Sequence, residues 1–232
     1  MYRATASLHT HAQPVTALAF DPVSDTLWSG DNAGVVLAVH SVHAIRGVSF
    51  PVGGALPVKH IAVADNHIRA LGVAGHGVGA WAKGGVNRWY YRPSPATVAA
   101  VSPSTFPSNI LAAATSAPDV VLLNAISGAV LRQSPAPAHI SHLAFSHSTL
   151  LAAYADGYVR THDPRTAMRR ENSDVLAHAS GVQDLQVSGN FFFTIGWSSR
   201  FAPSAVASFH SLHPGVVTTS LTHSSRSTIY AT

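Results

Sequence analysis

Residues 15–39 read VTALAFDPVSDTLWSGDNAGVVLAV, three short apolar segments separated by two turn-forming stretches. Segments of four to six β-branched or apolar residues, bounded by Gly, Pro, Asn, Asp and Ser, are typical of strands in hairpins. The stretch therefore predicts three antiparallel strands joined by tight turns. The predicted strands are 15–20, 26–29 and 35–39.

Similar segments recur along the chain at nearly constant intervals. Five of them begin at Val15, Val58, Val98, Ile140 and Val182, so that their starts lie 43, 40, 42 and 42 residues apart. A period of about 40–45 residues with four short strands in each period is typical of the blades of a WD-repeat β-propeller. An ordinary β-sandwich with accidental spacing is the alternative.

Each period subdivides in the same way. The fourth contains a turn at Asp156-Gly157, and such turns supply the positive φ that tight hairpins need. The alanine-rich stretch 111–114 lies between Pro107 and Pro118, which favours a short strand over a helix. We expect an all-β, incomplete propeller of four to five blades over residues 1–200. Further strands are predicted at 46–50, 87–91, 129–133, 150–154 and 158–162.

Composition narrows the class of protein. Hydrophobic residues make up 47% of the chain and charged residues 10%, whereas soluble domains average about 25% charged residues. The net charge of +4 comes from scattered residues, which is weak evidence for nucleic-acid binding. The absence of cysteine excludes disulfides and thiolate metal sites, and no apolar run approaches the roughly 18 residues of a membrane helix. We expect a soluble intracellular protein that does not bind membranes.

Several motifs, in this order and spacing, point to one family. They are Leu27-Trp-Ser-Gly30, Gly34-Val-Val36, Asp156-Gly-Tyr-Val-Arg160, His162-Asp-Pro-Arg-Thr166, Ala177-His178, Gly189-Asn190 and Thr194-Ile-Gly-Trp-Ser-Ser-Arg200. Over residues 11–200 the chain resembles the amino-terminal WD-repeat domain of the catalytic subunit of the poly(A)-nuclease deadenylation complex. A generic WD-repeat scaffold shares the Gly-x-Val turn, but not the later elements in sequence.

The resemblance implies a non-catalytic scaffold fragment concerned with shortening the poly(A) tails of mRNA. It implies two partners, the pseudokinase-like adaptor subunit of that complex and poly(A) coated with poly(A)-binding protein. It also implies a cytoplasmic location, in P-bodies. Direct contact with nucleic acid stays open, and a generic WD-repeat adaptor in another intracellular complex is the alternative.

The pattern changes after Arg200. Residues 201–232 contain seven Ser, five Thr and three His, and the last acidic residue of the chain is Asp184. We expect a Ser/Thr/His-rich tail that is poorly ordered, or that arises from an altered reading frame, a retained intron, a truncated gene model or an isoform. An incomplete propeller would leave sheet faces bare near 15–50 and 181–197, so we expect the isolated chain to be unstable, to aggregate or to pair through its open edge.

The residues of common catalytic sites are missing. The nuclease domain of the resembled enzymes opens with Asp-x-Glu, but the one glutamate here, Glu171, follows Arg169 and Arg170. No Gly-x-Ser-x-Gly occurs, and no Gly-Lys-Ser/Thr follows the glycines of 72–79, so 75–79 is predicted as a hairpin turn. We therefore expect no enzyme and no catalytic, cofactor-binding or metal-binding residues.

Histidines and one aromatic run leave narrower alternatives. The fifteen histidines raise the hypothesis of a metal-dependent hydrolase, although close pairs lack carboxylate or thiolate partners. His178 is expected to hydrogen-bond within a Ser/Thr–Asp network, with Asp184 as its candidate partner. The run Trp89-Tyr90-Tyr91 between Arg88 and Arg92 would either stack on bases or form a blade-packing strand with one exposed tyrosine.

Overall fold

The computed structural model describes the greater part of the chain, and every regular element among the described residues is a β-strand. No helix in the described part of the chain is long and apolar enough to cross a membrane. The described residues are 10–52, 55–64, 67–73, 77–93, 98–103, 109–165, 170–188, 191–197, 205–211, 219–223 and 229–231.

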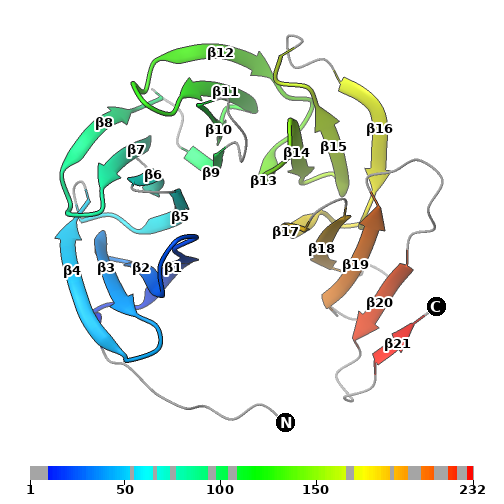
Figure 1. The fold of residues 1–232 in the computed structure, drawn as a ribbon. Helices are drawn as coiled ribbons and strands as arrows, with labels where there is room; N and C mark the ends of the chain where they lie inside the picture. Colours follow the sequence, from blue (N-terminus) through cyan, green and yellow to red (C-terminus); the bar gives the residue numbers. More distant parts are fainter. Residues whose placement is uncertain are drawn as a thin grey trace. The chain divides into compact units, whose positions relative to one another are not determined.

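The chain divides into two compact units, which are described separately. The first comprises Met1–Val101 with Ala125–Ala129, and the second comprises Ser102–Asn124 with Val130–Thr232. The strands are drawn in chain order in Figure 1.

The first unit contains two four-stranded sheets in which strands follow one another antiparallel in chain order. The first sheet consists of β1 (Val15–Phe20), β2 (Thr26–Asp31), β3 (Val35–His40) and β4 (Ile45–Pro51). The second consists of β5 (Val58–Ala64), β6 (His67–Val73), β7 (Gly77–Ala82) and β8 (Asn87–Tyr91).

The second unit contains the fourth and fifth sheets and most of the third, in the order β12-β11-β10-β9, whose strand β9 spans the boundary between the units. The third sheet consists of β9 (Val98–Pro103), β10 (Ile110–Thr115), β11 (Asp119–Asn124) and β12 (Val130–Pro135). The fourth consists of β13 (Ile140–Ser146), β14 (Thr149–Tyr154), β15 (Tyr158–His162) and β16 (Arg170–Leu176). The fifth consists of β17 (Val182–Ser188), β18 (Phe191–Trp197), β19 (Ala205–Ser211), β20 (Thr219–His223) and β21 (Ile229–Ala231).

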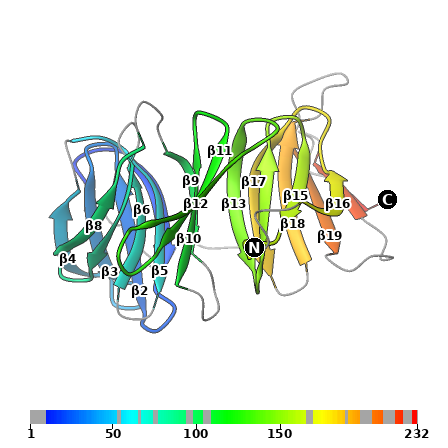
Figure 2. The same cartoon turned by 90° about the horizontal axis from the view of Figure 1, so that it is seen from above.

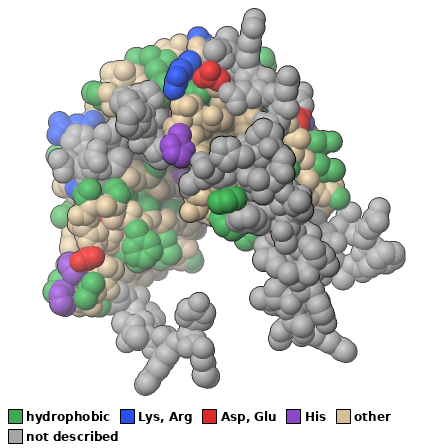
Figure 3. Space-filling model, turned by 45° about the vertical axis from the view of Figure 1, so that its right-hand side comes forward, with side chains coloured by type: hydrophobic (Ala, Val, Ile, Leu, Met, Phe, Trp, Pro, Cys, Tyr) green, Lys and Arg blue, Asp and Glu red, His purple; other side chains and the backbone are tan. Residues whose placement is uncertain are grey.

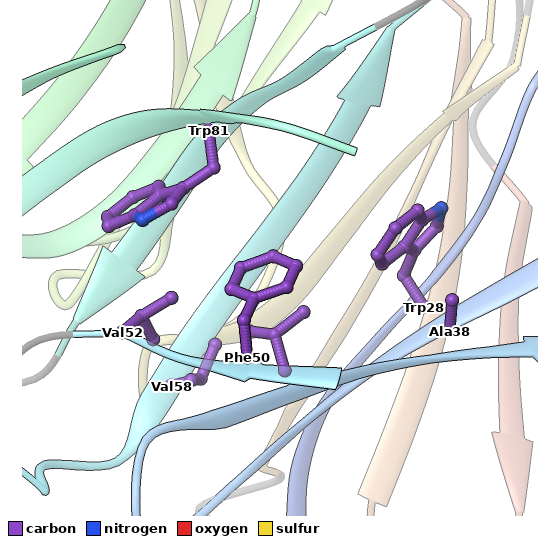
Figure 4. Close-up of a cluster of buried hydrophobic side chains, with 7 residues drawn as sticks. Trp28, Ala38, Phe50, Val52, Val58 and Trp81 are labelled. Carbon is purple, nitrogen blue, oxygen red and sulfur yellow. The ribbon is translucent and has the colours of Figure 1, made fainter. Parts of the chain in front are cut away.

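In the first unit, the first and second sheets pack face to face around an apolar cluster, part of which Figure 4 shows. The indole of Trp28 and the ring of Phe50 lie 6.5 Å apart and meet the side chains of Val58 and Trp81 from the second sheet. The hydroxyl of Thr16 on β1 donates to the carbonyl of Val58 on β5 (2.6 Å). Each blade therefore needs its neighbour to bury one of its faces.

In the second unit, the fourth and fifth sheets pack in the same manner, and their strands run beside one another in Figure 2. Leu151 and Val159 of the fourth sheet pack against Leu185 and Phe192 of the fifth. The hydroxyl of Ser141 donates to the carbonyl of Val182 (2.7 Å). The bond is equivalent to that of Thr16 with Val58: in both, the second residue of one sheet's first strand donates to the first residue of the next sheet's first strand. One period of the sequence therefore corresponds to one sheet in the stack.

The strands expected from the sequence are confirmed, and so are the turns at Gly34 and Gly157. Gly34 and Gly157 take the positive φ that the predicted turns require (78° and 89°). The alanine-rich stretch is strand β10 and not a helix. The fourth strands predicted near 46–50, 87–91 and 129–133 correspond to β4, β8 and β12. The hairpin turn predicted at 75–79 is wrong over 77–79, because Gly77 to Gly79 pair with neighbouring strands as the start of β7, and residues 75 and 76 lie outside the described residues.

The segment 201–232 differs from its sequence prediction in one respect. Its strands β19, β20 and β21 extend the fifth sheet, and β19 pairs with β18 from Trp197 opposite Ala205 to Phe191 opposite Ser211. Residue 200 is therefore not a boundary of this sheet. The other residues of the segment lie outside the described part of the chain, and their poor order stays a prediction.

Candidate functional site

A buried polar network joins the segment before β1 to the end of β2. The Nδ1–H of His11 donates to the carboxylate of Asp31 (2.9 Å), and its Nε2 lies 2.7 Å from the hydroxyl of Ser29. The same carboxylate accepts the backbone N–H groups of Ala33 and Val35 (both 2.9 Å). Burial opposes ionisation of Asp31, but these hydrogen bonds outweigh it and hold its pKa below the usual range. The network is a structural device that fixes the β2–β3 turn.

Replacing Asp31 with asparagine is expected to lower the free energy of unfolding by about 1–3 kcal/mol at pH 7, because a buried charge-assisted hydrogen bond is lost. Since the folded pKa of Asp31 lies below the unfolded value of about 3.9, its stabilisation is present above that pH. It is lost as the pH falls through the folded pKa. Urea unfolding of both proteins from pH 7 to pH 3 should therefore show the difference shrinking below about pH 4.

Asp25→Asn is the matched control for this substitution, because Asp25 is exposed in the turn before β2. We expect it to change the free energy of unfolding by less than about 0.5 kcal/mol. A difference between the Asp31→Asn variant and the unsubstituted protein that stays constant down to pH 3 would contradict an ionised Asp31 in the network.

The fifth sheet keeps part of this arrangement. His178 is buried and its Nε2 lies 3.0 Å from the hydroxyl of Thr194, the position that Ser29 occupies in the first sheet. The position of Asp31 is taken by Gly196, where a Cβ would lie 2.4 Å from the ring of His178. A carboxylate therefore has no room here, and burial lowers the pKa of His178.

The predicted partner of His178 was wrong. The carboxylate of Asp184 lies 3.6 Å from Nε2 of His142 on the adjacent sheet, not against His178. The predicted bond to a Ser or Thr is confirmed by Thr194 on β18, but the strand register that places Thr194 there could not be derived from spacing alone. His142 and Asp184 connect the fourth and fifth sheets.

The fourth sheet carries a different cluster, which the sequence analysis missed. Arg160 is buried, and its guanidinium lies 4.4 Å from the ring centre of Tyr154 and 4.8 Å from that of Tyr158. Two of its nitrogens donate to the carboxylate of Asp156 (3.1 and 2.6 Å), and Nε lies 3.4 Å from Asp174. Burial opposes ionisation of Asp156, but the bonds from Arg160 keep its pKa below the usual range.

In the first unit, the carboxylate of Asp21 links the two sheets. Lys83 of the second sheet lies 2.5 Å from Asp21, which also accepts the indole N–H of Trp28 (3.3 Å) and the backbone N–H of Val23 (3.0 Å). Burial alone would raise the pKa of Asp21, but these partners lower it. The two buried carboxylates of the first unit, Asp21 and Asp31, are thus committed to structural contacts.

The histidines of the described residues do not form a metal site. No group of three or more His, Asp or Glu side chains in the described part of the chain could hold a metal ion. The pair His40 and His43 stacks at 4.8 Å, and the backbone N–H of His43 donates to the ring of His40 (3.3 Å). His9, His210 and His213 lie outside the residues whose side chains are described.

Strand β8 presents one aromatic and two basic side chains at the surface. Trp89 is buried and its indole donates to the carbonyl of Ala125 (3.0 Å), whereas Tyr90, Arg88 and Arg92 are exposed. The prediction of a blade-packing strand with one exposed tyrosine is confirmed. Burial of part of Tyr90 raises its pKa, although Arg92 opposes this, so the phenol stays neutral and the surface is cationic. Figure 3 shows one face of the molecule, where the described side chains include many hydrophobic ones and few charged ones.

Comparisons of sequence and of architecture both find relatives in the family expected above. The chain is 31% identical over 198 residues to the PAN2-PAN3 deadenylation complex catalytic subunit PAN2 of Cryptococcus neoformans, covering 79% of the chain. It is 25% identical over 191 residues to the same subunit of Chaetomium thermophilum. The resemblance to the WD-repeat region of Pan2 is confirmed. The chain spans 16% of the length of these Pan2 relatives, and no protein-family model matches it.

Comparison with solved structures identifies the same fold. The Neurospora crassa Pan2 WD40 domain aligns with a TM-score of 0.76 and 21% identity, over 96% of this chain and 76% of that domain. The computationally designed Ika8 protein aligns with a TM-score of 0.75 and 16% identity, over 97% of this chain and 72% of that protein. The chain therefore has the fold of a WD-repeat β-propeller, and its described residues contribute five sheets to that fold.

Proposed function

We propose that this chain is a non-catalytic WD-repeat scaffold of a deadenylation complex and serves the shortening of mRNA poly(A) tails. The observation that carries the proposal is the 31% identity over 198 residues to the catalytic subunit of the PAN2-PAN3 complex. The paired carboxylates of both units, which hold strands and turns together, support a structural role. The missing Asp-x-Glu motif supports the absence of nuclease activity.

Two partners follow from the proposal: the pseudokinase-like adaptor subunit of the complex, and poly(A) coated with poly(A)-binding protein. The exposed row of Arg88, Tyr90 and Arg92 on an edge strand is a candidate contact, because a cationic edge favours an extended acidic segment. We place the chain in the cytoplasm, in P-bodies. A generic adaptor role in another intracellular complex is the competing proposal.

Co-purification tests the scaffold role. The tagged chain is co-expressed with the PAN3 subunit of Cryptococcus neoformans, and we expect the chain to retain PAN3 on the affinity resin. The designed Ika8 protein is the fold-matched control, since it shares the architecture at 16% identity. Retention of PAN3 by both proteins, or by neither, would overturn the proposal and leave the generic adaptor.

The captured complex also allows the non-catalytic claim to be tested. The purified chain, alone or with PAN3, is incubated with poly(A) and Mg²⁺, and we expect no release of AMP, because the paired carboxylates of a two-metal nuclease are missing from the sequence. Release of AMP that a chelator abolishes would contradict this expectation.

A further inference from the structure

In three of the sheets the first strand buries the same three positions, whereas in the first sheet it leaves them exposed. In β5, β13 and β17 the first, fourth and sixth residues are buried or partly buried against the preceding sheet. They are Val58, Ile61 and Val63; Ile140, Leu143 and Phe145; and Val182, Leu185 and Val187. In β1 the same positions are Val15, Leu18 and Phe20, and they are 48%, 62% and 75% exposed.

In the fifth sheet it is the second strand, β18, that exposes apolar residues which are buried at the equivalent positions of other sheets. Ser29, Ala152 and Thr194 stand opposite the fourth residue of the strand before them, which fixes the correspondence between sheets. The residues on either side of that position point toward the following sheet. They are Trp28 and Gly30 in the first sheet, Leu151 and Ala153 in the fourth, and Phe193 and Ile195 in the fifth.

In the first and fourth sheets these positions are buried against the sheet that follows. Trp28, Leu151 and Ala153 belong to the apolar clusters between sheets, and Gly30 lies directly against Val58. Phe193 and Ile195 are each 43% exposed, and Phe191 beside them is 39% exposed. The fifth sheet therefore has the residues of a stacking face, and the first sheet has the residues that such a face receives.

We propose that the chain associates head to tail with a second copy, the β18 face of one copy packing on the β1 face of the other. The two faces are complementary because their counterparts already meet inside the chain, β2 with β5 and β14 with β17. Both consist of uncharged apolar side chains, so burying them against each other is favourable. A contact between two different faces leaves one of each free, so association continues beyond the dimer.

The polar network of the first sheet is compatible with this packing. His11 lies on the same side of the sheet as Ser29, whose partner strand position is Leu18. His178 occupies the equivalent place beside Thr194 while the fourth and fifth sheets are stacked around it. His11 therefore leaves the β1 face free to receive another sheet.

Complementing variants of the full chain test the proposal by sedimentation velocity. Leu18→Asp and Phe193→Asp each place a carboxylate in the proposed contact, and each alone is expected to weaken self-association at least about 10-fold. A mixture of the two is expected to form a 1:1 dimer of twice the 24.2 kDa chain mass and nothing larger. This dimer uses the intact β18 face of one variant and the intact β1 face of the other.

Val42→Asp is the matched control, because Val42 is 68% exposed in the β3–β4 turn, away from both faces. Circular dichroism checks that each variant is folded, and Leu18→Ser with Phe193→Ser serves as the second pair if a carboxylate prevents folding. An unsubstituted chain that is monomeric at every concentration would overturn the proposal. So would a mixture without recovery, which would indicate that one face pairs with itself or that neither takes part.

Discussion

Replacing Trp28 with alanine is expected to lower the free energy of unfolding of the first unit by about 3–5 kcal/mol, the usual cost of removing a large buried aromatic side chain. Trp28 is buried where the first and second sheets meet, 6.5 Å from the ring of Phe50. Its indole also donates to Asp21, which in turn holds Lys83. One substitution therefore opens a cavity and removes a partner from the contact between the sheets.

Guanidinium chloride unfolding, followed by tryptophan fluorescence and circular dichroism, measures the change. Trp28→Phe keeps an apolar ring but removes the donor to Asp21, so its loss should be clearly smaller than that of alanine. Val86→Ala, at an exposed position between β7 and β8, should stay within about 0.5 kcal/mol of the unsubstituted chain. A loss below about 1 kcal/mol for Trp28→Ala would show that the sheets do not depend on this cluster.

Many of the strands, including the first strand of every sheet, could be predicted because strand spacing and turn chemistry are local properties. Val58 and Val182 begin strands at the intervals that the repeat requires, and Asp156-Gly157 marks a turn by its composition alone. Even the outcome at Trp89 and Tyr90 followed from the alternation of side chains along a strand. The resemblance to Pan2 rests on the same local motifs.

The polar partners could not be predicted, because they depend on register between strands that are distant in sequence. A histidine before β17 indicated a bond to a Ser or Thr, yet only the pairing of β17 with β18 places Thr194 beside His178 and Gly196 where an acid would stand. Strand β19 was missed for a related reason. Its Ser, Ala and His residues give little apolar signal, and it is recognised only by its pairing with β18.

The cluster around Arg160 is the clearest of these missed features. Its members come from β14, β15, β16 and the turn between the first two, and no motif connects them. Arg160 pairs with both Asp156 and Asp174, and its guanidinium also lies against the rings of Tyr154 and Tyr158. Removing the cation of such a cluster leaves its carboxylates without a counter-charge, and this costs more free energy than the intact ion pair contributes to stability.

Arg160→Ala is therefore expected to lower the free energy of unfolding of the second unit by about 3 kcal/mol at pH 7, toward the lower end for buried ion pairs because both carboxylates reach solvent in part. Arg160→Lys keeps the charge but loses the two-pronged contact, so we expect a smaller loss. Adding Asp174→Asn to Arg160→Ala should recover part of the loss, since it removes an uncompensated carboxylate.

The pH dependence separates this electrostatic cost from the loss of packing. The pKa of Asp156 is lowered in the folded chain, so its stabilisation is present above the unfolded value of about 3.9 and is lost as the pH falls through the folded pKa. Without Arg160 the part of this contribution that comes from its bonds to Asp156 is missing at every pH, while the backbone N–H of Tyr158 still donates to the carboxylate. Urea unfolding at pH 7 and pH 3 should therefore show the gap between the Arg160→Ala variant and the unsubstituted chain narrowing in acid. A gap that is unchanged at pH 3 would mean that Arg160 stabilises the sheet through its contacts with the tyrosine rings alone.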